Sequence, residues 1–304
     1  MEPPVFTSID SYGARLGDVG YWRPYAEAAL ASSGLPEQRM PSGFEGTYPT
    51  LVGGHLVVKL FGYFPGWRES VAAETAANRA IERIDGISAP RIVATGSLFP
   101  GRDDEWPFLV MERLNGLAWR EADLEVRTAE SVARHLGSQI RRLHQSGSAD
   151  LHLGRGEWLS AHGQQAAERH QEWGSLPKHL IDQIPSYLSS YEAERGCLVH
   201  GDLTEDHIFV KEGALLGIID WGDAMVTDPF YELGALHLGA FAGERRLLSQ
   251  FLVGYGWRLD EAFVDHALQV ALMHEFDLFR PISNLTEDSS SLTVLAKQLW
   301  TPIP

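Results

Sequence analysis

Cysteine is almost absent from this 304-residue chain, because Cys197 is the only one. The chain can therefore form no internal disulfide and no zinc site built from clustered cysteines, so a metal would have to bind oxygen or histidine ligands. The sequence also lacks an apolar run of the roughly 20 residues that span a bilayer. Its start, Met1-Glu2-Pro3-Pro4, has neither the basic nor the apolar region of a signal peptide, so we expect a cytoplasmic protein.

Several common catalytic motifs are missing as well. The sequence contains no Gly-x-Ser-x-Gly element, no His-Glu-x-x-His zinc helix and no pair of thiols. It also lacks the Gly-x-Gly-x-x-Gly and Walker patterns of phosphate-binding loops. Chemistry that depends on a serine elbow, a zinc helix or a thiol pair therefore has no support in the sequence.

Positive charge is scarce and unevenly placed. The formal net charge is −16, of which residues 1–120 carry −3 and residues 121–304 carry −13. A field of this sign repels phosphate backbones and anionic membranes, so neither nucleic acid nor a membrane is an expected partner. Since 44% of the residues are hydrophobic, the chain can bury a large core and global disorder is excluded.

The first part of the chain has the pattern of a small sheet with few helices. Turn-forming residues at 41–50 predict a loop, and β-forming residues predict the strands that follow it. The predicted helices are Tyr21–Ser33 and Glu69–Ile87, and the predicted strands are Leu51–Leu60, Arg91–Thr95 and Phe108–Leu114. We interpret residues 1–114 as an N-terminal lobe that ends in a hinge.

From residue 115 onward the pattern becomes helical, so we interpret residues 115–304 as a larger, mainly helical C-terminal lobe. Within Thr128–Gln145 the apolar residues recur at helical spacing, which predicts one buried face. Gly147–Gln171 has few apolar anchors and is predicted to be a surface connection. Short strands are expected at Leu198–Val199, Ile208–Val210 and Leu215–Ile219, with helices after them. The expected fold class is α+β.

A dense group of polar residues lies among these short strands. Asp202, His207 and Asp220 follow or precede strand-like runs, where a rigid backbone can bring polar side chains together. Phosphoryl transfer needs such a set, with one carboxylate for the attacking hydroxyl and further ligands for magnesium. The kinase pattern His-x-Asp-x-x-x-x-Asn fits His200 and Asp202 but has histidine at 207, and Asp220-Trp-Gly222 resembles the Asp-Phe-Gly element.

A kinase of this kind also needs a strand lysine paired with a helical glutamate. Lys59 lies in the apolar run Leu56–Phe61, where an unpaired ammonium group would be costly. Glu74 is the expected partner, and Glu69 is the competing one.

These stretches together resemble the aminoglycoside phosphotransferases, a family with the two-lobed protein-kinase-like fold. The resemblance covers nearly the whole chain and is closest to the streptomycete hygromycin B 7''-O-kinases. It is carried by Tyr21-Trp-Arg-Pro24, Val57-Val-Lys-Leu-Phe-Gly62, Trp106-Pro-Phe-Leu-Val-Met111, Gly116-Leu-Ala-Trp-Arg120, Leu236-His-Leu238 and Gln298-Leu-Trp300. The Gly217–Asp228 run is also similar to aminoglycoside 2''-phosphotransferases, some of which carry histidine where most relatives carry asparagine.

The resemblance implies a role for each residue of the polar group. Asp202 would be the catalytic carboxylate that receives the sugar hydroxyl, and His207 and Asp220 would hold Mg2+. Histidine is a softer ligand than magnesium prefers, so the role of His207 is open. His200 is expected to brace the loop, and Asp228-Pro229 to begin a helix as N-cap and first-turn proline.

ATP or GTP would be the phosphoryl donor, and further residues are expected to bind it. The turn-rich segment Ser42–Thr47 could offer backbone amides and a hydroxyl to the phosphates, although a plain turn is nearly as good an interpretation. Residues 1–114 would form the nucleotide-binding lobe, and its hinge at Phe108–Leu114 would contact the purine through backbone groups near Met111–Arg113. The candidates are Lys59, Glu74, Gly43, Gly46, Thr47, Met111, Glu112 and Arg113.

The acceptor of an aminoglycoside phosphotransferase is polycationic, so carboxylates should line its pocket. Glu275 and Asp277 are the first candidates, because they would end a predicted helix at Phe263–Phe279, where the helix dipole disfavours acids. Glu205, Asp206 and Asp223 are further candidates.

Two other functions stay open at this point. A kinase for choline, homoserine, methylthioribose or a macrolide would share the Asp202 loop, and an acidic pocket does not separate choline from an aminoglycoside. A kinase-fold module that binds nucleotide without turnover is suggested by the histidine at 207. Retention of Lys59, Glu74, Asp202 and Asp220 argues against this module.

Overall fold

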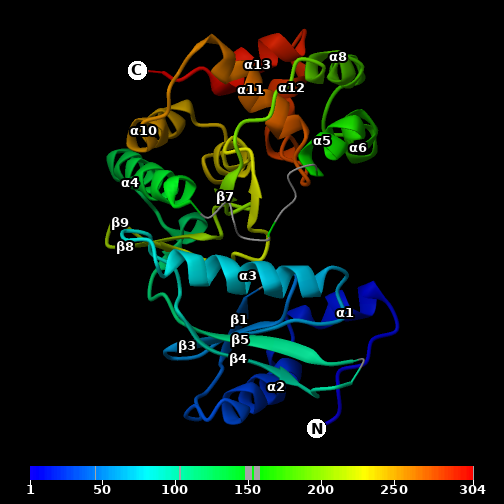
Figure 1. Ribbon diagram of the computed structural model, residues 1–304, viewed down its shortest axis with the longest axis vertical. Coiled ribbons are helices and arrows are strands. Elements are labelled where there is room, and N and C mark those ends of the chain that lie inside the picture. The colour runs from blue at the N-terminus through cyan, green and yellow to red at the C-terminus, as the bar shows by residue number, and fades with distance from the viewer. Residues whose placement is uncertain (45, 103, 148–152, 154–157, 304) are drawn as a thin grey trace. The chain divides into compact units, whose positions relative to one another are not determined.

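The computed structural model describes residues 1–44, 46–102, 104–147, 153 and 158–303 (Figure 1). Its chain forms two compact units. The first comprises residues 1–82 and 89–115, and the second comprises residues 83–88 and 116–304. The division after residue 115 lies beside the boundary at 114/115 expected from the sequence, but the segment 83–88 belongs to the second unit.

The first unit is built around a five-stranded antiparallel sheet in the order β1-β2-β3-β5-β4. Its strands are β1 (Ser42–Phe44), β2 (Thr50–Val52), β3 (Leu56–Leu60), β4 (Ile92–Leu98) and β5 (Trp106–Glu112), and its helices are α1 (Ile9–Leu16), α2 (Val19–Ser32) and α3 (Trp67–Ile81). Figure 1 shows α2 on one face of this sheet and α3 on the other.

The alternation of side chains along β3 explains how the two helices are held. Val58 and Leu60 are fully buried in the cluster that contains Trp22 of α2. Phe61 belongs to a second cluster, against which Trp67 of α3 packs. Because successive side chains on a strand point to opposite faces, Lys59 lies on the same face as Phe61 and therefore faces α3.

The predicted elements of the first unit differ from the structure mainly at turns. The predicted strand Leu51–Leu60 is a hairpin, because Gly53-Gly54 forms a turn in which the Gly53 amide donates to the Leu56 carbonyl at 2.8 Å. The predicted loop at 41–50 contains β1, which pairs with β2. The predicted helix Glu69–Ile87 begins at Trp67 and ends at Ile81.

The second unit is mainly helical. Its α-helices are α4 (Val126–Gln145), α5 (Trp158–Gln164), α6 (Ala166–Trp173), α7 (Lys178–Ile181), α8 (Ile184–Leu188), α9 (Tyr231–Gly234), α10 (Arg245–Tyr255), α11 (Glu261–Leu272), α12 (Ser283–Glu287) and α13 (Leu292–Trp300), with a π-helical turn η3 (Ala235–Ala240) and the 3-10 turns η1 (Trp119–Glu121) and η4 (Arg280–Ile282). The predicted buried face of α4 is confirmed at Val132, Leu136, Ile140 and Leu143.

Helices α4 and α10 pack closely because glycines stand at their contact. A Cβ atom on Gly137 of α4 would lie 2.1 Å from the Phe251 carbonyl oxygen, and one on Gly254 of α10 would lie 1.9 Å from that of Arg134. No other residue type fits at these two positions without moving the helices apart.

Two small sheets carry the loops with the polar residues. Strand β7 (Cys197–Val199) pairs with β10 (Met225–Thr227), and β8 (Ile208–Lys211) lies between β6 (Leu117–Ala118) and β9 (Ala214–Ile218). The expected strands near 198, 208 and 215 are therefore present. The loop 200–207 joins β7 to β8, and the loop 219–224 joins β9 to β10.

The predicted surface connection Gly147–Gln171 is wrong where the structure describes it. Residues 158–164 form α5, and α6 buries Ala166 and His170. Few apolar residues are needed to anchor so short a helix, which is why the pattern did not show it. Residues 148–152 and 154–157 lie outside the described part of the chain. Of the helices that are described, none has the length and apolar character needed to cross a membrane.

Candidate active site residues in the two units

In the first unit, Lys59 and Glu74 form a buried ion pair. The Lys59 Nζ atom lies 2.8 Å from Glu74 Oε2, and the two side chains are 6% and 1% exposed. The Lys59 ammonium group also lies near the rings of Tyr48 and Phe61, at 5.7 and 5.3 Å from their centroids. The expected pairing with Glu74 is present, whereas Glu69 lies exposed in the first turn of α3. Such a pair holds the lysine headgroup in one place.

The segment expected to contact phosphates is only partly a loop. Gly43 belongs to β1 and pairs with Leu51, so it is a strand residue, and a Cβ there would lie 3.1 Å from the Thr50 carbonyl oxygen. Gly46 and Thr47 follow in an exposed segment that leads into β2. The close approach at Gly43 is therefore to the neighbouring strand.

The end of β5 was expected to be a hinge that reads the purine. Met111 lies instead in the interior of the sheet and is 7% exposed. The Glu112 amide donates to Arg91 O, and the Arg113 amide donates to His55 O, each at 2.9 Å. These two amides have acceptors within the first unit, and the contact of backbone groups near Met111–Arg113 with a purine stays a prediction.

In the second unit, the loop 200–207 is fixed by His200. Its ring is fully buried against Trp221, and its Nε2 donates to the Ile219 carbonyl at 2.8 Å. Its Nδ1 therefore accepts the Asp202 amide, at 3.2 Å. His200 has the bracing position expected from the sequence, because it joins the 200–207 and 219–224 loops.

Gly201 permits this loop conformation. Its φ is +89°, and a Cβ at this position would lie 2.2 Å from the Asp223 carbonyl oxygen. Both the positive φ and the contact exclude a side chain. Asp223 is exposed, and its backbone faces the loop that carries Asp202.

Asp202, His207 and Asp220 lie together in the second unit. His207 Nδ1 is 2.6 Å from the Asp202 carbonyl oxygen and 3.6 Å from its Oδ2, and His207 Nε2 is 3.9 Å from Asp220 Oδ2. Desolvation raises the pKa of Asp202 despite the two nearby histidines, which act to lower it. Asp220 has a φ of +61°, a strained conformation of the kind found at functional sites.

Asp220 presents a carboxylate, the kind of ligand that magnesium prefers, whereas His207 presents a nitrogen, which is a softer donor. Since a carbonyl can only accept, His207 Nδ1 is the donor to Asp202, and the neutral ring has its lone pair on Nε2, toward Asp220. Magnesium usually takes few protein ligands beside phosphate and water oxygens. Among the described residues, no group of three or more His, Cys, Asp or Glu that could hold a metal ion is present.

Arg120 contacts two of the expected acceptor residues and was not foreseen from the sequence. Its guanidinium group lies 3.1 Å from Glu205 Oε1 and also pairs with Asp206. The Arg120 amide donates to the Glu205 carbonyl as well. These carboxylates are therefore already paired with a cation, which weakens them as binding groups for a cationic acceptor.

The expected helix Phe263–Phe279 is wrong at its C-terminal end. Helix α11 ends at Leu272, and Glu275 and Asp277 follow it in a turn. The helix stops because His274 Nδ1 accepts the Phe276 amide at 3.1 Å, a local bond that competes with helix continuation. Asp277 is 11% exposed and accepts a hydrogen bond from Ser175, whereas Glu275 is exposed.

A second unforeseen residue is Glu232, which is 1% exposed on α9. Its Oε2 accepts the His200 amide at 2.7 Å and lies 3.9 Å from His144 Nε2. The expectation that Asp228 caps this helix is wrong, because α9 starts at Tyr231, after Phe230. The Asp228 carboxylate accepts hydrogen bonds from the Tyr191 hydroxyl, the His266 ring and the backbone amides of Glu194 and Phe230. Sequence spacing alone gives no signal for either carboxylate.

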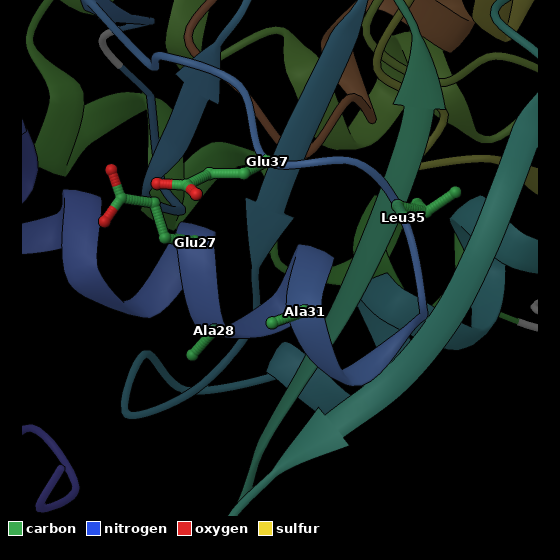
Figure 2. A pocket seen from close by; sticks show the side chains of 5 residues that line it. All are labelled: Glu27, Ala28, Ala31, Leu35 and Glu37. Carbon is green, nitrogen blue, oxygen red and sulfur yellow. The ribbon is translucent and has the colours of Figure 1, made fainter.

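A hollow of about 310 Å³ lies elsewhere in the first unit, beside α2 (Figure 2). It is lined by Glu27, Ala28, Ala31, Leu35 and Glu37. Figure 2 shows the two carboxylates together and Leu35 apart from them. None of the residues expected to bind substrates lines this hollow.

The fold is shared with solved aminoglycoside phosphotransferases. A GDP and kanamycin complex of APH(2'')-IIIa superposes with a TM-score of 0.67 at 19% identity over 82% of this chain and 88% of that chain. APH(3'')-Id from Streptomyces rimosus gives a TM-score of 0.58 at 18% identity, with coverages of 86% and 98%. At these identities the likeness shows the fold, which is the protein-kinase-like fold expected from the sequence.

The sequence also matches a family model, that of the phosphotransferase enzyme family, over residues 38–266. Because this match spans most of the chain, the protein belongs to that family. A further relative, the lysine-specific demethylase JMJ21 of Arabidopsis thaliana, is 22% identical over half of this chain. The match covers only 21% of the length of that protein.

Proposed function

We propose that this phosphotransferase moves the γ-phosphoryl group of ATP or GTP to a hydroxyl group of an aminoglycoside. The observation that carries the proposal is the position of His207, whose ring lies 3.6 Å from the Asp202 carboxylate and 3.9 Å from the Asp220 carboxylate. Solved structures of the same fold include complexes with GDP, ATP and ADP, which supports a nucleotide donor. Some of them contain kanamycin, streptomycin or gentamicin, which supports the acceptor class.

Asp202 is the residue proposed to accept the proton of the acceptor hydroxyl. The hydroxyl oxygen forms a bond to the γ-phosphorus, the bond from that phosphorus to the bridging oxygen breaks, and the nucleoside diphosphate leaves. The hydroxyl proton passes to the Asp202 carboxylate. Burial raises the pKa of this carboxyl, which makes it a better proton acceptor than an exposed aspartate.

His207 and Asp220 are the proposed magnesium ligands, through Nε2 and the carboxylate. A bound magnesium ion would neutralise phosphate charge. In the first unit, Lys59 is proposed to contact the nucleotide phosphates while Glu74 fixes its position. Gly46 and Thr47 are proposed to lie along the same phosphates.

Hygromycin B is the particular acceptor that we propose, with the 7''-hydroxyl as the modified group. The support is the sequence resemblance carried by stretches such as Val57–Gly62 and Gln298–Trp300. Of the acceptor-binding candidates, Glu275 and Asp223 are exposed carboxylates in the second unit. Glu205 and Asp206 pair with Arg120, and Asp277 pairs with Arg280 and Ser175, and we propose all five carboxylates as contacts to the acceptor.

Mass spectrometry of acceptors incubated with the protein, magnesium and ATP or GTP tests this function. The panel contains hygromycin B, kanamycin, streptomycin and choline, with a chelator in parallel reactions. We expect a gain of one phosphoryl group on hygromycin B and none after chelation. Phosphorylation of choline alone would show that the acceptor is not an aminoglycoside. Phosphorylation of no acceptor, despite nucleotide binding, would refute the proposal.

A further inference from the structure

Helix α1 contributes a buried tyrosine to the segment that enters β2. Tyr12 is 1% exposed, and its hydroxyl donates to the Thr47 carbonyl oxygen at 2.7 Å. Helix α1 lies before residue 38, where the match to the phosphotransferase family begins. The contact therefore comes from outside the part of the chain that matches the family.

The position of the Tyr12 hydroxyl is fixed by its surroundings. The Tyr12 ring packs edge-on against the Phe6 ring, with 5.2 Å between the ring centroids, and it also packs against the rings of Tyr63 and Phe64. The helix itself is anchored by a capping box in which the Ser8 and Ser11 side chains bond each other's backbone amides. Burial raises the pKa of Tyr12, so the hydroxyl keeps its proton and remains a donor at neutral pH.

The accepting carbonyl belongs to the Gly46–Pro49 segment, which leads into β2, the strand that pairs with the Lys59 strand β3. The next residue, Tyr48, is 7% exposed, and its ring lies 5.7 Å from the Lys59 ammonium group. Thr50 then pairs directly with Lys59 in the sheet. A bond at Thr47 therefore holds the backbone just before this segment joins the strand beside Lys59.

We propose that Tyr12 is a positioning residue, which holds Gly46–Pro49 in the conformation that receives the nucleotide phosphates. This inference rests on the proposed function of that segment. Tyr12 contacts no substrate in this scheme and acts only through the Thr47 carbonyl. Nucleotide affinity is therefore the property that it controls, and acceptor affinity is independent of it.

The test compares Tyr12→Phe with Tyr25→Phe, measuring nucleotide binding by calorimetry in the absence of acceptor. Phenylalanine keeps the packed ring and removes only the hydrogen bond. Tyr25 offers a matched control, because its hydroxyl donates to the Glu2 carbonyl at 3.1 Å, also within the first unit but away from Gly46–Pro49. We expect Tyr12→Phe to weaken ATP binding about three- to tenfold, the effect of one hydrogen bond, and Tyr25→Phe to leave it unchanged.

Hydrogen exchange gives a second measurement that does not depend on activity. Peptides that cover residues 46–52 should exchange faster in Tyr12→Phe, whereas peptides from α3 and β5 should not change. Unaltered ATP affinity in Tyr12→Phe, or an equal loss in Tyr25→Phe, would overturn the proposal. Steady-state kinetics should show a higher KM for ATP and the same KM for the acceptor. If the wild type binds ATP but phosphorylates no acceptor, the proposed function fails while this comparison still gives its answer.

Discussion

The carboxylate of Glu232 accepts a hydrogen bond from the backbone amide of His200 at 2.7 Å, and both residues are buried. The bond connects α9 to the loop that carries Asp202. His200 makes two further bonds, to Ile219 and to the Asp202 amide, so Glu232 supports the loop through a residue that does not react. The buried Glu232 carboxylate therefore helps to fix the position of the loop that carries Asp202.

Replacing Glu232 should therefore impair turnover as well as stability. Glu232→Ala leaves the buried His200 amide without its acceptor, which should cost about 2 kcal/mol of the free energy of unfolding. The displaced loop should lower kcat on the order of 100-fold. Glu232→Gln keeps an oxygen acceptor and should retain most of both. Chemical denaturation and steady-state kinetics measure the two effects, and equal losses in Gln and Ala variants would refute this role.

The Lys59–Glu74 pair should behave as a buried charge pair. Lys59→Met or Glu74→Leu alone leaves one buried charge without its partner and should cost about 3–5 kcal/mol of stability. The double variant should recover most of that loss, yet ATP binding should remain weak because the ammonium group is absent. Urea unfolding of the four proteins gives the coupling between the residues.

The exposed pair Arg91–Glu112 provides the control for this cycle, with an Arg91 Nη2 to Glu112 Oε1 distance of 2.6 Å. Arg91→Ala should leave stability without a measurable change, because water already solvates both groups. If the losses of unfolding free energy in the Lys59 and Glu74 variants simply added in the double variant, the two residues would not be coupled and the prediction would be wrong.

Asp202 should control turnover and the acid side of the pH profile. Asp202→Asn should lower kcat about 100- to 10,000-fold while ATP affinity and unfolding stay near wild type. Burial raises the pKa of Asp202 above its usual 3.8. The ionised form accepts the proton, so kcat/KM should fall as the pH drops through this raised pKa.

The measurement is kcat/KM from pH 4.5 to 8, with surface Asp182→Asn as the control for loss of a carboxylate. An Asp202→Asn protein with wild-type kcat would exclude the proposed proton acceptor.

Acid should destabilise the protein through buried histidines in the second unit. Desolvation lowers the pKa of His170 and His237 to about 4 and that of His274 to about 3. Once unfolded, each ring takes up a proton below about pH 6.5, so the unfolded state binds more protons. The stability present above pH 6.5 should therefore be lost as the pH falls toward 4, by up to about 1.4 kcal/mol per pH unit for each ring.

Urea unfolding at pH 7.5, 6.0 and 5.0 follows this loss. His237→Gln can still donate to the Leu299 carbonyl, which the His237 ring contacts at 2.9 Å, but it cannot take up a proton. Its stability should therefore depend less steeply on pH than that of the wild type. A wild-type stability that is constant between pH 7.5 and 5.0 would contradict the argument.

Local sequence patterns were sufficient for the parts of the fold that depend on neighbours in the chain. The spacing of Val132, Leu136 and Ile140 predicted the buried face of α4, and the apolar run around Lys59 predicted a strand with a buried partner. The partner Glu74 could be predicted because kinases pair a strand lysine with a helical glutamate. These predictions succeed because burial repeats with the period of the element.

Contacts between segments that are distant in the chain give no comparable periodic pattern in the sequence. Nothing in the sequence links Arg120 to Glu205, 85 residues later, or Glu232 to His200. The predicted end of α11 at Phe279 was also wrong, because the hydrogen bond from the Phe276 amide to His274 depends on the orientation of the His274 ring, which the sequence does not give. The assignments of Asp202, His207 and Asp220 to catalysis and metal binding remain predictions.

Because α2 packs on one face of the sheet, a chain that is shortened at its N-terminus would lose this helix and expose that face. A fragment cloned from residue 38, where the family match starts, would lose Trp22 and Leu30, both 0–1% exposed in the intact molecule. The sheet surface beneath them would then meet water as one apolar area, and such surfaces promote aggregation. Chimeras between this enzyme and its relatives should therefore keep the first 37 residues with the strands that they shield.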